Sequence, residues 1–288
     1  MNGSMRMLVF DSGLGGLTVA RALRRLAAGR VRLDYAADFA GFPYGDWEEE
    51  ALKAHLVALM GQLIARAAPD VVIIACNTAS TLALEHLRAA FPQVPFVGTV
   101  PAIKPAATAT QSGIIGVLAT PGTVRREYTE KLVHTFAWHH RVVLHGARGL
   151  AALAEEKLRT GEVDMRALRE EIAPAFVQGA DGARTDVVVL GCTHYPLLLE
   201  ELQEAAPWPV RFIDPSEAIA RQALRVAGLA VAGDAAAGAA PDPDEAGQGE
   251  AIITGIAAGW SEAGLRRVFA REGFGRVRVL TVAPGRDT

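Results

Sequence analysis

The sequence predicts an α/β fold with two similar lobes, each a mostly parallel sheet flanked by helices. Three observations predict it. Short apolar runs alternate with longer amphipathic segments. The runs are continuously apolar, which is typical of strands buried on both faces. One run also recurs, with the residues that follow it, in the second half of the chain. Ligands of such sheets bind beyond the carboxyl ends of the strands, so residues just after each strand are the candidates for function.

The apolar runs place the elements in chain order. The predicted strands are residues 6–10, 31–36, 71–75, 95–100, 113–119, 142–145, 187–191 and 210–213. Apolar residues at helical spacing predict helices between them, most clearly at 48–67, 81–90 and 218–227. Residues 229–250 are nearly all Ala, Gly, Pro and Asp, a composition that predicts a flexible loop. Beyond it, the pattern predicts strands at 251–256 and 277–282 and a helix near 261–271.

A weak internal repeat relates the two halves of the chain. Residues 70–78, Asp-Val-Val-Ile-Ile-Ala-Cys-Asn-Thr, resemble residues 186–194, Asp-Val-Val-Val-Leu-Gly-Cys-Thr-His. A strand followed by proline recurs after each segment, and the turns at 10–13 and 119–122 form a third candidate pair. We therefore expect a first lobe of residues 1–99 and 213–288 and a second lobe of residues 100–212. The lobes should be pseudo-symmetric and should face one another across the active site.

The two cysteines of the chain, Cys76 and Cys192, both end a predicted strand and lead into a helix. A lone cysteine in an apolar run is most simply a small buried hydrophobe. Two thiols at matching positions favour chemistry instead, because the positive end of a helix dipole favours the thiolate form.

The choice of chemistry depends on there being two thiols. A redox pair is usually a Cys-x-x-Cys motif, and a metal site needs three or four ligands. A nucleophilic cysteine would leave the second thiol unexplained. Two opposed thiols suit another reaction, in which one removes a proton from a stereogenic carbon and the other returns a proton to the opposite face. The pKa of an ordinary thiol, about 8.5, keeps both forms accessible near neutral pH.

A glycine-rich turn, residues 11–16, follows the first predicted strand and opens a helix. A dinucleotide loop would need glycine where Thr18 stands, which disfavours nucleotide binding. The bare amides of residues 13–16 suit a carboxylate ligand. Asp11 would then orient an ammonium group or assist a thiol, and a helix N-cap is the alternative.

Other polar residues at strand ends complete the candidate site. Tyr44 and Gly45 offer a phenol donor and a backbone amide, and Ser12, Thr120, Thr123 and Thr193 offer hydroxyl groups suited to an anion. His194 lies two residues past Cys192, where it could hold or relay the proton of that thiol. The other six histidines are expected at the surface or paired. Glu155, beside Glu156, is expected on a solvated helix face.

Composition excludes several classes of protein. The net charge of −3 over 288 residues gives no basic surface for nucleic acid. No apolar run is long enough to span a membrane, and residues 1–5 do not predict a secretory leader. Two cysteines cannot form a disulfide framework, so a cytoplasmic, reducing location is expected. A homodimer is one of the oligomeric states that the sequence allows.

Four segments together resemble the glutamate racemases of the aspartate/glutamate racemase family. They are Asp-Ser-Gly-Leu-Gly-Gly-Leu-Thr at 11–18, Pro-Tyr-Gly at 43–45, Ala-Cys-Asn-Thr-Ala-Ser at 75–80 and Leu-Gly-Cys-Thr-His-Tyr-Pro at 190–196. The resemblance covers roughly residues 5–228, and the cysteine segments are its most specific part. It implies interconversion of L- and D-glutamate, without a cofactor or metal, for peptidoglycan synthesis and hence for the cell wall and cell shape.

The resemblance also implies roles for single residues. The thiol matching Cys76 acts on D-glutamate and the thiol matching Cys192 acts on L-glutamate, assisted by Asp11 and His194 respectively. With the hydroxyls of Thr120 and Thr123 included, the expected substrate contacts are Asp11, Ser12, Tyr44, Gly45, Asn77, Thr78, Thr120, Thr123, Glu155, Thr193 and His194.

The chain departs from the family pattern in places. Residues 39–42, Phe-Ala-Gly-Phe, replace the usual Asn/Thr-Ala-Arg run, and Arg126 stands where serine is usual. Ala147 and Arg148 replace a Cys-Pro pair, and residues 229–288 differ from the usual tail. These differences bear on regulation, dimer contacts and entry to the site, and they leave the thiol pair unchanged. The rival hypotheses are an aspartate racemase, a non-catalytic binding module for acidic amino acids and a redox protein.

Overall fold

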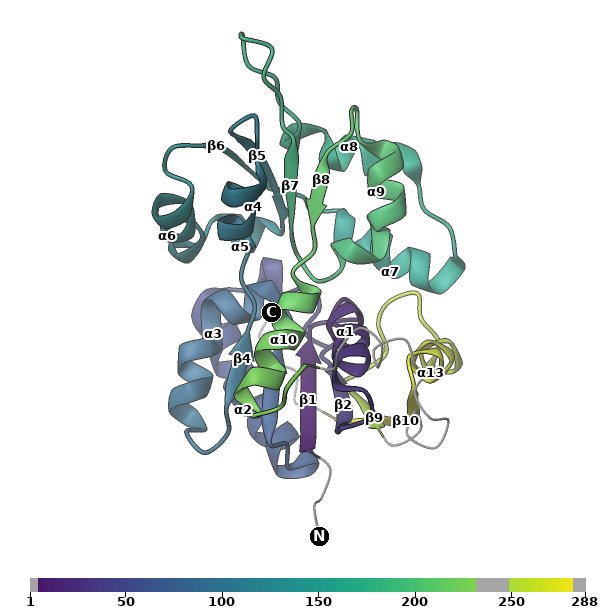
Figure 1. The fold of residues 1–288 in the computed structure, drawn as a ribbon. Coiled ribbons are helices and arrows are strands. Elements are labelled where there is room, and N and C mark those ends of the chain that lie inside the picture. Colours follow the sequence, from purple (N-terminus) through teal and green to yellow (C-terminus); the bar gives the residue numbers. More distant parts are fainter. Residues whose placement is uncertain (1–4, 232–248, 282–288) are drawn as a thin grey trace. The chain divides into compact units, whose positions relative to one another are not determined.

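Parallel β-sheets form the centre of both halves of the chain (Figure 1). The computed structural model describes residues 5–231 and 249–281. The chain divides into two compact units: unit 1 contains residues 1–98 and 216–288, and unit 2 contains residues 99–215. The chain therefore passes from one unit to the other at residues 98–99 and 215–216. The expected boundaries were 99–100 and 212–213. The predicted α/β fold, with a parallel sheet and flanking helices in each half, is confirmed.

Unit 1 has a six-stranded sheet in the order β10-β9-β2-β1-β3-β4. Every pair of neighbouring strands is parallel. The strands are β1 (Met5–Asp11), β2 (Val31–Ala37), β3 (Val71–Ile74), β4 (Phe96–Gly98), β9 (Gly249–Ile253) and β10 (Phe274–Val279). The helices are α1 (Leu17–Ala27), α2 (Glu49–Ala67), α3 (Asn77–Ala90), α10 (Ser216–Val226) and α13 (Glu262–Arg271), with a short 3-10 helix η1 (Tyr44–Asp46). Helix α1 packs against α10, and α2 packs against α3.

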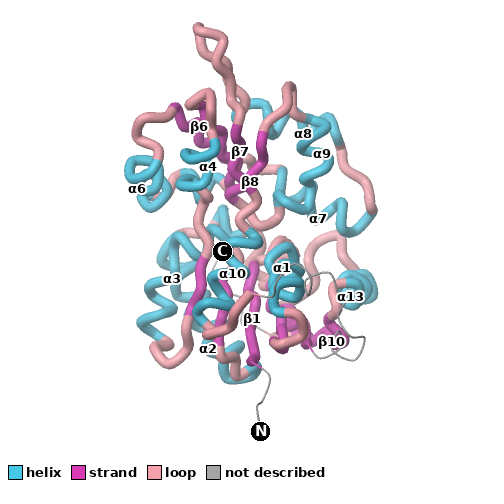
Figure 2. Tube along the Cα trace, viewed as in Figure 1, coloured by secondary structure: helices cyan, strands magenta, loops and turns pink. Residues whose placement is uncertain are grey.

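Unit 2 has a four-stranded parallel sheet in the order β6-β5-β7-β8. Its strands are β5 (Ile114–Ala119), β6 (Arg141–Gly146), β7 (Val187–Gly191) and β8 (Arg211–Ile213). The helices are α4 (Ile103–Ala109), α5 (Pro121–Val124), α6 (Glu127–Phe136), α7 (Leu150–Thr160), α8 (Met165–Ile172) and α9 (Leu199–Ala205), with 3-10 helices η2 (Ala173–Ala175) and η3 (Tyr195–Leu198). In Figure 2 the strands run through the middle of each unit, with helices around them.

The two sheets share one strand order. The four strands β2-β1-β3-β4 of unit 1 correspond in sequence order to β6-β5-β7-β8 of unit 2. Cys76 and Cys192 therefore follow equivalent strands, β3 and β7, and Asp11 and Thr120 stand at the ends of equivalent strands, β1 and β5. This agrees with all three sequence matches of the internal repeat. Unit 1 differs by the two strands β9 and β10, which extend its sheet beyond β2.

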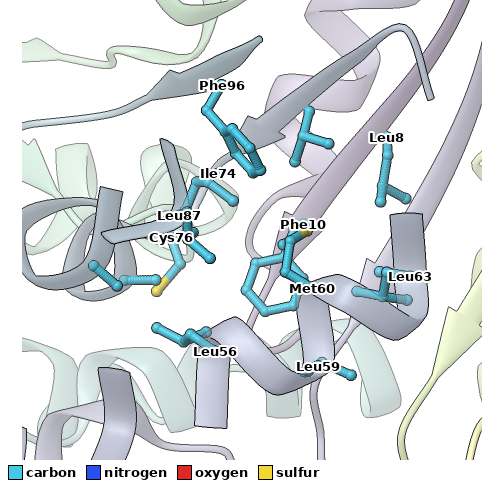
Figure 3. Close-up of a cluster of buried hydrophobic side chains, with 14 of the residues drawn as sticks. Leu8, Phe10, Leu56, Leu59, Met60, Leu63, Ile74, Cys76, Leu87 and Phe96 are labelled. Atoms are coloured by element: carbon cyan, nitrogen blue, oxygen red, sulfur yellow. The ribbon is translucent and has the colours of Figure 1, made fainter. Parts of the chain in front are cut away.

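Apolar side chains on the sheets and helices form a separate core in each unit. In unit 1, Leu8, Phe10 and Ile74 of the sheet pack against Leu56 and Met60 of α2 (Figure 3). Cys76 belongs to this cluster, and Cys192 belongs to the corresponding cluster of unit 2. The two thiols thus lie where an apolar core meets the carboxyl end of a sheet. None of the described helices is both long and apolar enough to cross a membrane.

Several predicted boundaries were wrong by a few residues. Helix α3 begins at Asn77 and not at residue 81, because its first turn consists of small polar residues that resemble a loop. Strand β9 begins at Gly249, inside the predicted loop. A Cβ at Gly249 would collide with the carbonyl oxygen of Leu33, so this glycine permits strand pairing. Strand β10 is Phe274–Val279 where 277–282 was predicted. The rest of the predicted loop, residues 232–248, and residues 1–4 and 282 lie outside the described residues.

Candidate active site

Cys76 lies at the turn between β3 and α3 in unit 1. It is the N-cap residue of α3, so its backbone is extended while its carbonyl already accepts the amide of Ser80, at 2.9 Å. The Ser80 hydroxyl donates to the carbonyl of Ile74, at 2.8 Å, and closes the turn. The thiol is not part of a disulfide, and the residue is 6% exposed. The first turn of a 14-residue helix therefore directs its positive end toward this sulfur.

The turn after β1 supplies a hydroxyl group to the same thiol. Strand β1 is paired with β3 so that Phe10 is opposite Ile74, which brings the two following turns together. The Ser12 hydroxyl lies 3.8 Å from Sγ of Cys76. Asp11 is fully buried, and its Oδ1 accepts the amide of Gly13 at 2.8 Å. The N-cap residue of α1 is Gly16, so the alternative of Asp11 as a helix N-cap is wrong.

Asn77 carries a buried amide group that has no partner. The residue is 2% exposed, and neither Oδ1 nor Nδ2 of its side chain has a hydrogen-bond partner among the described residues. Leaving two buried polar atoms unpaired costs about 1–3 kcal/mol each, so native proteins rarely keep them. The amide directly follows Cys76, and a ligand with both a donor and an acceptor would satisfy it. Thr78, the next residue, is also buried.

The hydroxyl of Tyr44 has an acceptor that the sequence did not suggest. Its hydroxyl donates to Oδ2 of Asp38, at 2.5 Å. Burial and then the charge of Asp38 raise the pKa of Tyr44 well above its usual value of about 10, so the phenol stays protonated. Because its one proton is already donated to Asp38, Tyr44 would have to give up this hydrogen bond to act as the expected donor to a substrate carboxylate. Gly45 lies beside it in η1.

Cys192 in unit 2 has an imidazole as its polar neighbour. Its Sγ lies 3.9 Å from Nδ1 of His194, and Nε2 of His194 lies 2.9 Å from Oε1 of Glu155. A carboxylate only accepts hydrogen bonds, so this contact places the proton of a neutral His194 on Nε2. Nδ1 then faces the thiol as an acceptor. The three side chains are all buried, and they form a chain that can hold a proton between sulfur and imidazole.

Two expectations about this half are corrected. Glu155 does not lie on a solvated helix face: it is 9% exposed and bonded to His194, because α7 turns Leu150, Leu153 and Ala154 into the core on the same side. Cys192 does not lead directly into an α-helix. The 3-10 helix η3 follows, and α9 begins only at Leu199. Proline at 196, in the first turn of η3, fits this short helix.

The remaining predicted residues of unit 2 lie after β5 and β7. Thr120 is the N-cap of α5, and its hydroxyl accepts the amide of Thr123, at 3.2 Å. The two hydroxyls lie 3.0 Å apart. Thr193 is 3% exposed. Each unit therefore carries its own group of candidate residues: Asp11, Ser12, Tyr44, Gly45, Cys76, Asn77 and Thr78 in unit 1, and Thr120, Thr123, Glu155, Cys192, Thr193 and His194 in unit 2.

Sequence reasoning missed Asp38 as part of this region. It directly follows β2, at the carboxyl end of the sheet, and it is fully buried with three side-chain donors. One of them is His55, which fits the expectation of a paired histidine. Its position after a strand is the signal that could have found it. In the described part of the chain, no three His, Cys, Asp or Glu side chains gather as a metal site would require.

The comparisons with known proteins identify the family of this chain. The family model of the Asp/Glu/Hydantoin racemases matches residues 17–223, a range that includes both cysteines, Glu155 and His194. This chain belongs to that family. Among its relatives is the glutamate racemase of Brucella canis, 58% identical over 216 residues, which are 75% of this chain and 77% of that protein.

Solved structures of this family share the fold. The glutamate racemase of Escherichia coli, in complex with L-glutamate and an activator, is 37% identical, and the match covers 98% of this chain and 100% of that one, with a TM-score of 0.82. A glutamate racemase of Bacillus anthracis is 25% identical over 99% of each chain, with a TM-score of 0.75. Residues 224–288 lie outside the range matched by the family model.

Proposed function

We propose that this chain interconverts L- and D-glutamate by a 1,1-proton transfer, with Cys76 and Cys192 as the two acid/base groups. One thiolate removes the α-proton, and the other thiol protonates the opposite face of the same carbon. The observation that carries the proposal is that two buried thiols, neither in a disulfide, follow equivalent strands, each with a polar group of its own. The family and its glutamate racemase members support the choice of reaction.

Cys192 would exchange its proton with the help of His194. In the resting form, Nδ1 of His194 faces the thiol and Nε2 donates to Glu155. When the thiol transfers its proton to Nδ1, an imidazolium forms between a thiolate and a carboxylate. Both neighbours are negatively charged, so they stabilise the cation in a buried setting. This pair would supply the thiolate that removes the α-proton of L-glutamate.

Cys76 would act on D-glutamate with weaker side-chain assistance. Its charged form is favoured by the N-terminus of α3 and by the hydroxyl of Ser12. Asp11 follows β1 in the same region, and its carboxylate would orient the substrate ammonium or take up the thiol proton. Both functions need the buried negative charge that Asp11 would carry there.

The substrate would be held by groups at the strand ends. Asn77 offers an unpaired donor and an unpaired acceptor, which suit a carboxylate and an ammonium group. Thr78 and Thr193, the first residues past Asn77 and Cys192, offer hydroxyls and amides, with Ser12, Gly45, Thr120 and Thr123 as further donors. Tyr44 would form an apolar wall, since its proton is donated elsewhere. Neutral donors of this kind can bind two carboxylates without a metal or a cofactor.

The wider role that we propose is supply of D-glutamate for peptidoglycan in the cytoplasm, where thiols stay reduced. A homodimer is also expected, and light scattering on the purified protein would test it.

Incubation with L-glutamate in deuterated water, without added metal or pyridoxal phosphate, tests the function. Chiral chromatography with mass spectrometry should find D-glutamate that carries one deuterium at the α-carbon. L-Aspartate under the same conditions is the matched substrate control and should be racemised at least about a hundredfold more slowly. Faster reaction of aspartate would make the chain an aspartate racemase. Binding of glutamate without any deuterium uptake would make it a binding module and end the proposal.

A further inference from the structure

The C-terminal segment, residues 249–280, has no equivalent in the internal repeat. It adds β9, α13 and β10 to unit 1, and β9 pairs with β2 through Tyr35, Ala36 and Ala37. The described sheet of unit 2 ends at β6, with no such extension. The segment also lies outside the range matched by the family model. It therefore distinguishes the surroundings of Cys76 from those of Cys192.

Thr254, directly after β9, connects this segment to the turn that follows β2. Its hydroxyl donates to Oδ1 of Asp38 at 2.6 Å and accepts the amide of Ala40 at 3.0 Å. Its own amide donates to the carbonyl of Ala37, at 3.1 Å. These three contacts, to Ala37, Asp38 and Ala40, fix the beginning of the turn that ends in Pro43 and Tyr44. Thr254 is 9% exposed, so water competes little for these bonds.

Asp38, which Thr254 holds in place, is hydrogen-bonded to Tyr44. Burial by itself would raise the pKa of Asp38, but hydrogen bonds from His55, Thr254 and Tyr44 outweigh it and hold the pKa below the usual value. The carboxylate is therefore charged, and its bonds to these three groups are strong. Oδ2 of Asp38 accepts hydrogen bonds from the hydroxyl of Tyr44, at 2.5 Å, and from Nε2 of His55, at 2.6 Å.

Tyr44 in turn belongs to the buried cluster that contains Cys76. The short helix that carries Tyr44, η1, also contacts α3, the helix that Cys76 caps. There is little room for the ring to move. A Cβ on Gly41 would lie 2.7 Å from Cε1 of Tyr44, so the turn packs directly against the ring. A shift of Asp38 would displace Tyr44 and change the surroundings of the thiol.

The same segment supports the turn after β1. Tyr35 of β2 packs its ring against Phe269 of α13 and Phe274 of β10, with centroid distances of 5.7 Å to each. Its hydroxyl donates to the carbonyl of Gly13, at 2.8 Å, inside the turn that carries Ser12. Both turns beside Cys76 are therefore held by the C-terminal segment through buried side chains.

We propose that Thr254 is a positioning residue for proton transfer at Cys76: it fixes Asp38 and, through Asp38, the ring of Tyr44 in the buried cluster that contains the thiol. This inference rests on the proposed racemisation and adds to it a dependence of one half-reaction on the C-terminal segment. Cys192 belongs to unit 2, whereas this segment belongs to unit 1, so the proton transfer of Cys192 should be unaffected.

The test is Thr254→Val, which removes the hydroxyl and keeps the shape of the side chain. Displacement of a group beside the reacting atoms costs about ten- to a hundredfold in rate, so kcat should fall by about tenfold in both directions. The decisive readout is the substrate isotope effect, measured separately with α-deuterated D- and L-glutamate. It should rise for D-glutamate, whose deuteron Cys76 removes, and fall for L-glutamate, where slower reprotonation by Cys76 masks it.

Three further variants separate positioning from stability. Thr254→Ser keeps the hydroxyl and should restore the wild-type isotope effects. Thr185→Val removes a fully buried hydroxyl of unit 2 that bonds the backbone of Ala175 and Val177, and it should leave both isotope effects unchanged. Tyr35→Phe removes the hydrogen bond to the carbonyl of Gly13 and should also raise the isotope effect with α-deuterated D-glutamate. It tests the dependence on the C-terminal segment if Thr254→Val does not fold.

The outcomes are distinct. Isotope effects that stay at wild-type values, that change equally for the two enantiomers, or that rise only for L-glutamate would overturn the role of Thr254. If the wild-type chain forms no D-glutamate, the proposed function fails and this inference fails with it. If the wild-type chain racemises glutamate and the variants show no asymmetry, the inference alone fails.

Discussion

The two thiols occupy equivalent places in two similar sheets, yet their surroundings differ in kind. Cys76 is the N-cap of a long α-helix, with the Ser12 hydroxyl as its polar neighbour. Cys192 precedes a short 3-10 helix, and its neighbour is the imidazole of His194, backed by Glu155. One half relies on a helix terminus and a neutral hydroxyl, whereas the other relies on a titratable side chain.

A reaction that moves a proton at two faces of one carbon allows the two thiols to have different polar neighbours. Each thiol must lose a proton in one direction and supply one in the other, but how the thiolate is stabilised is free to vary. A helix dipole contributes about 0.3–1 kcal/mol at an exposed site and more when it is buried, and an imidazole contributes as a proton acceptor. Duplicated elements can thus keep a shared backbone and diverge in the side chains that serve the same atom.

The largest expected effect comes from removing either sulfur. Cys76→Ala and Cys192→Ala should each lower kcat for racemisation by at least about a thousandfold, in both directions, because general acid/base groups contribute factors of this size. Polarimetry or circular dichroism with each enantiomer measures it. Substantial racemisation by one of the two variants would mean that a single thiol suffices, and the equivalence of the two halves would be lost.

Glu155→Gln should show how far Cys192 depends on its carboxylate. A glutamine cannot stabilise the imidazolium of His194 by charge, so kcat should fall by about ten- to a hundredfold. The matched control is Glu156→Gln, since Glu156 is exposed and pairs only weakly with Arg159, at 3.5 Å.

Ser12→Ala is the corresponding change in the other half. It should cost only about a few-fold in kcat, because it removes a neutral hydroxyl and leaves the helix terminus in place. Equal losses for Glu155→Gln and Ser12→Ala would contradict the contrast between the two halves.

Asn77→Leu should separate binding from stability. Replacing a buried, unpaired amide with an apolar group of similar size should raise the free energy of unfolding by about 1 kcal/mol. The same change should lower kcat/KM by about tenfold or more, since the substrate loses its partners. Urea unfolding and steady-state kinetics on one preparation measure both. A destabilised variant with normal kcat/KM would show that the amide serves the fold and not the ligand.

The smallest expected effect is on the free energy of unfolding, and it comes from Asp70 and Asp186, which begin the two repeated segments. Burial alone would raise the pKa of Asp186, but hydrogen bonds from Thr110, Gln111 and Ser112 outweigh it and lower the pKa. Asp186→Asn should therefore cost about 1 kcal/mol or less, because the carboxylate is partly exposed.

That cost has a defined dependence on pH. A carboxyl whose pKa is lowered in the folded state stabilises it above the unfolded pKa, about 3.9, and loses this contribution as pH falls through the lower, folded pKa. The difference between wild type and Asp186→Asn should thus be largest near pH 7 and shrink below about pH 4. Urea unfolding at both pH values checks it. Asp70→Asn, at the matching position, is the control, since Asp70 accepts a hydrogen bond from the amide of Arg6, at 2.8 Å.

Local sequence pattern predicted the strands, the two thiols and most candidate residues, because burial and strand ends are features of short segments. The continuous apolar runs before Cys76 and Cys192 required buried parallel strands, and polar residues after such strands stand at the edge where ligands bind. The same reasoning failed for the start of α3 and for Gly249, where loop-like composition lies inside regular structure.

The sequence by itself determined the fold class and the placement of a thiol at the end of each repeated strand. Only the tertiary structure decided which side chains from distant segments pair with the groups near those thiols. Glu155 and His194 are hydrogen-bonded although they are 39 residues apart in the sequence, and Asp38 and Thr254 are hydrogen-bonded although they are 216 residues apart. Such pairs depend on the order and register of strands in a sheet. The periodicity of one segment does not predict which other segment lies beside it.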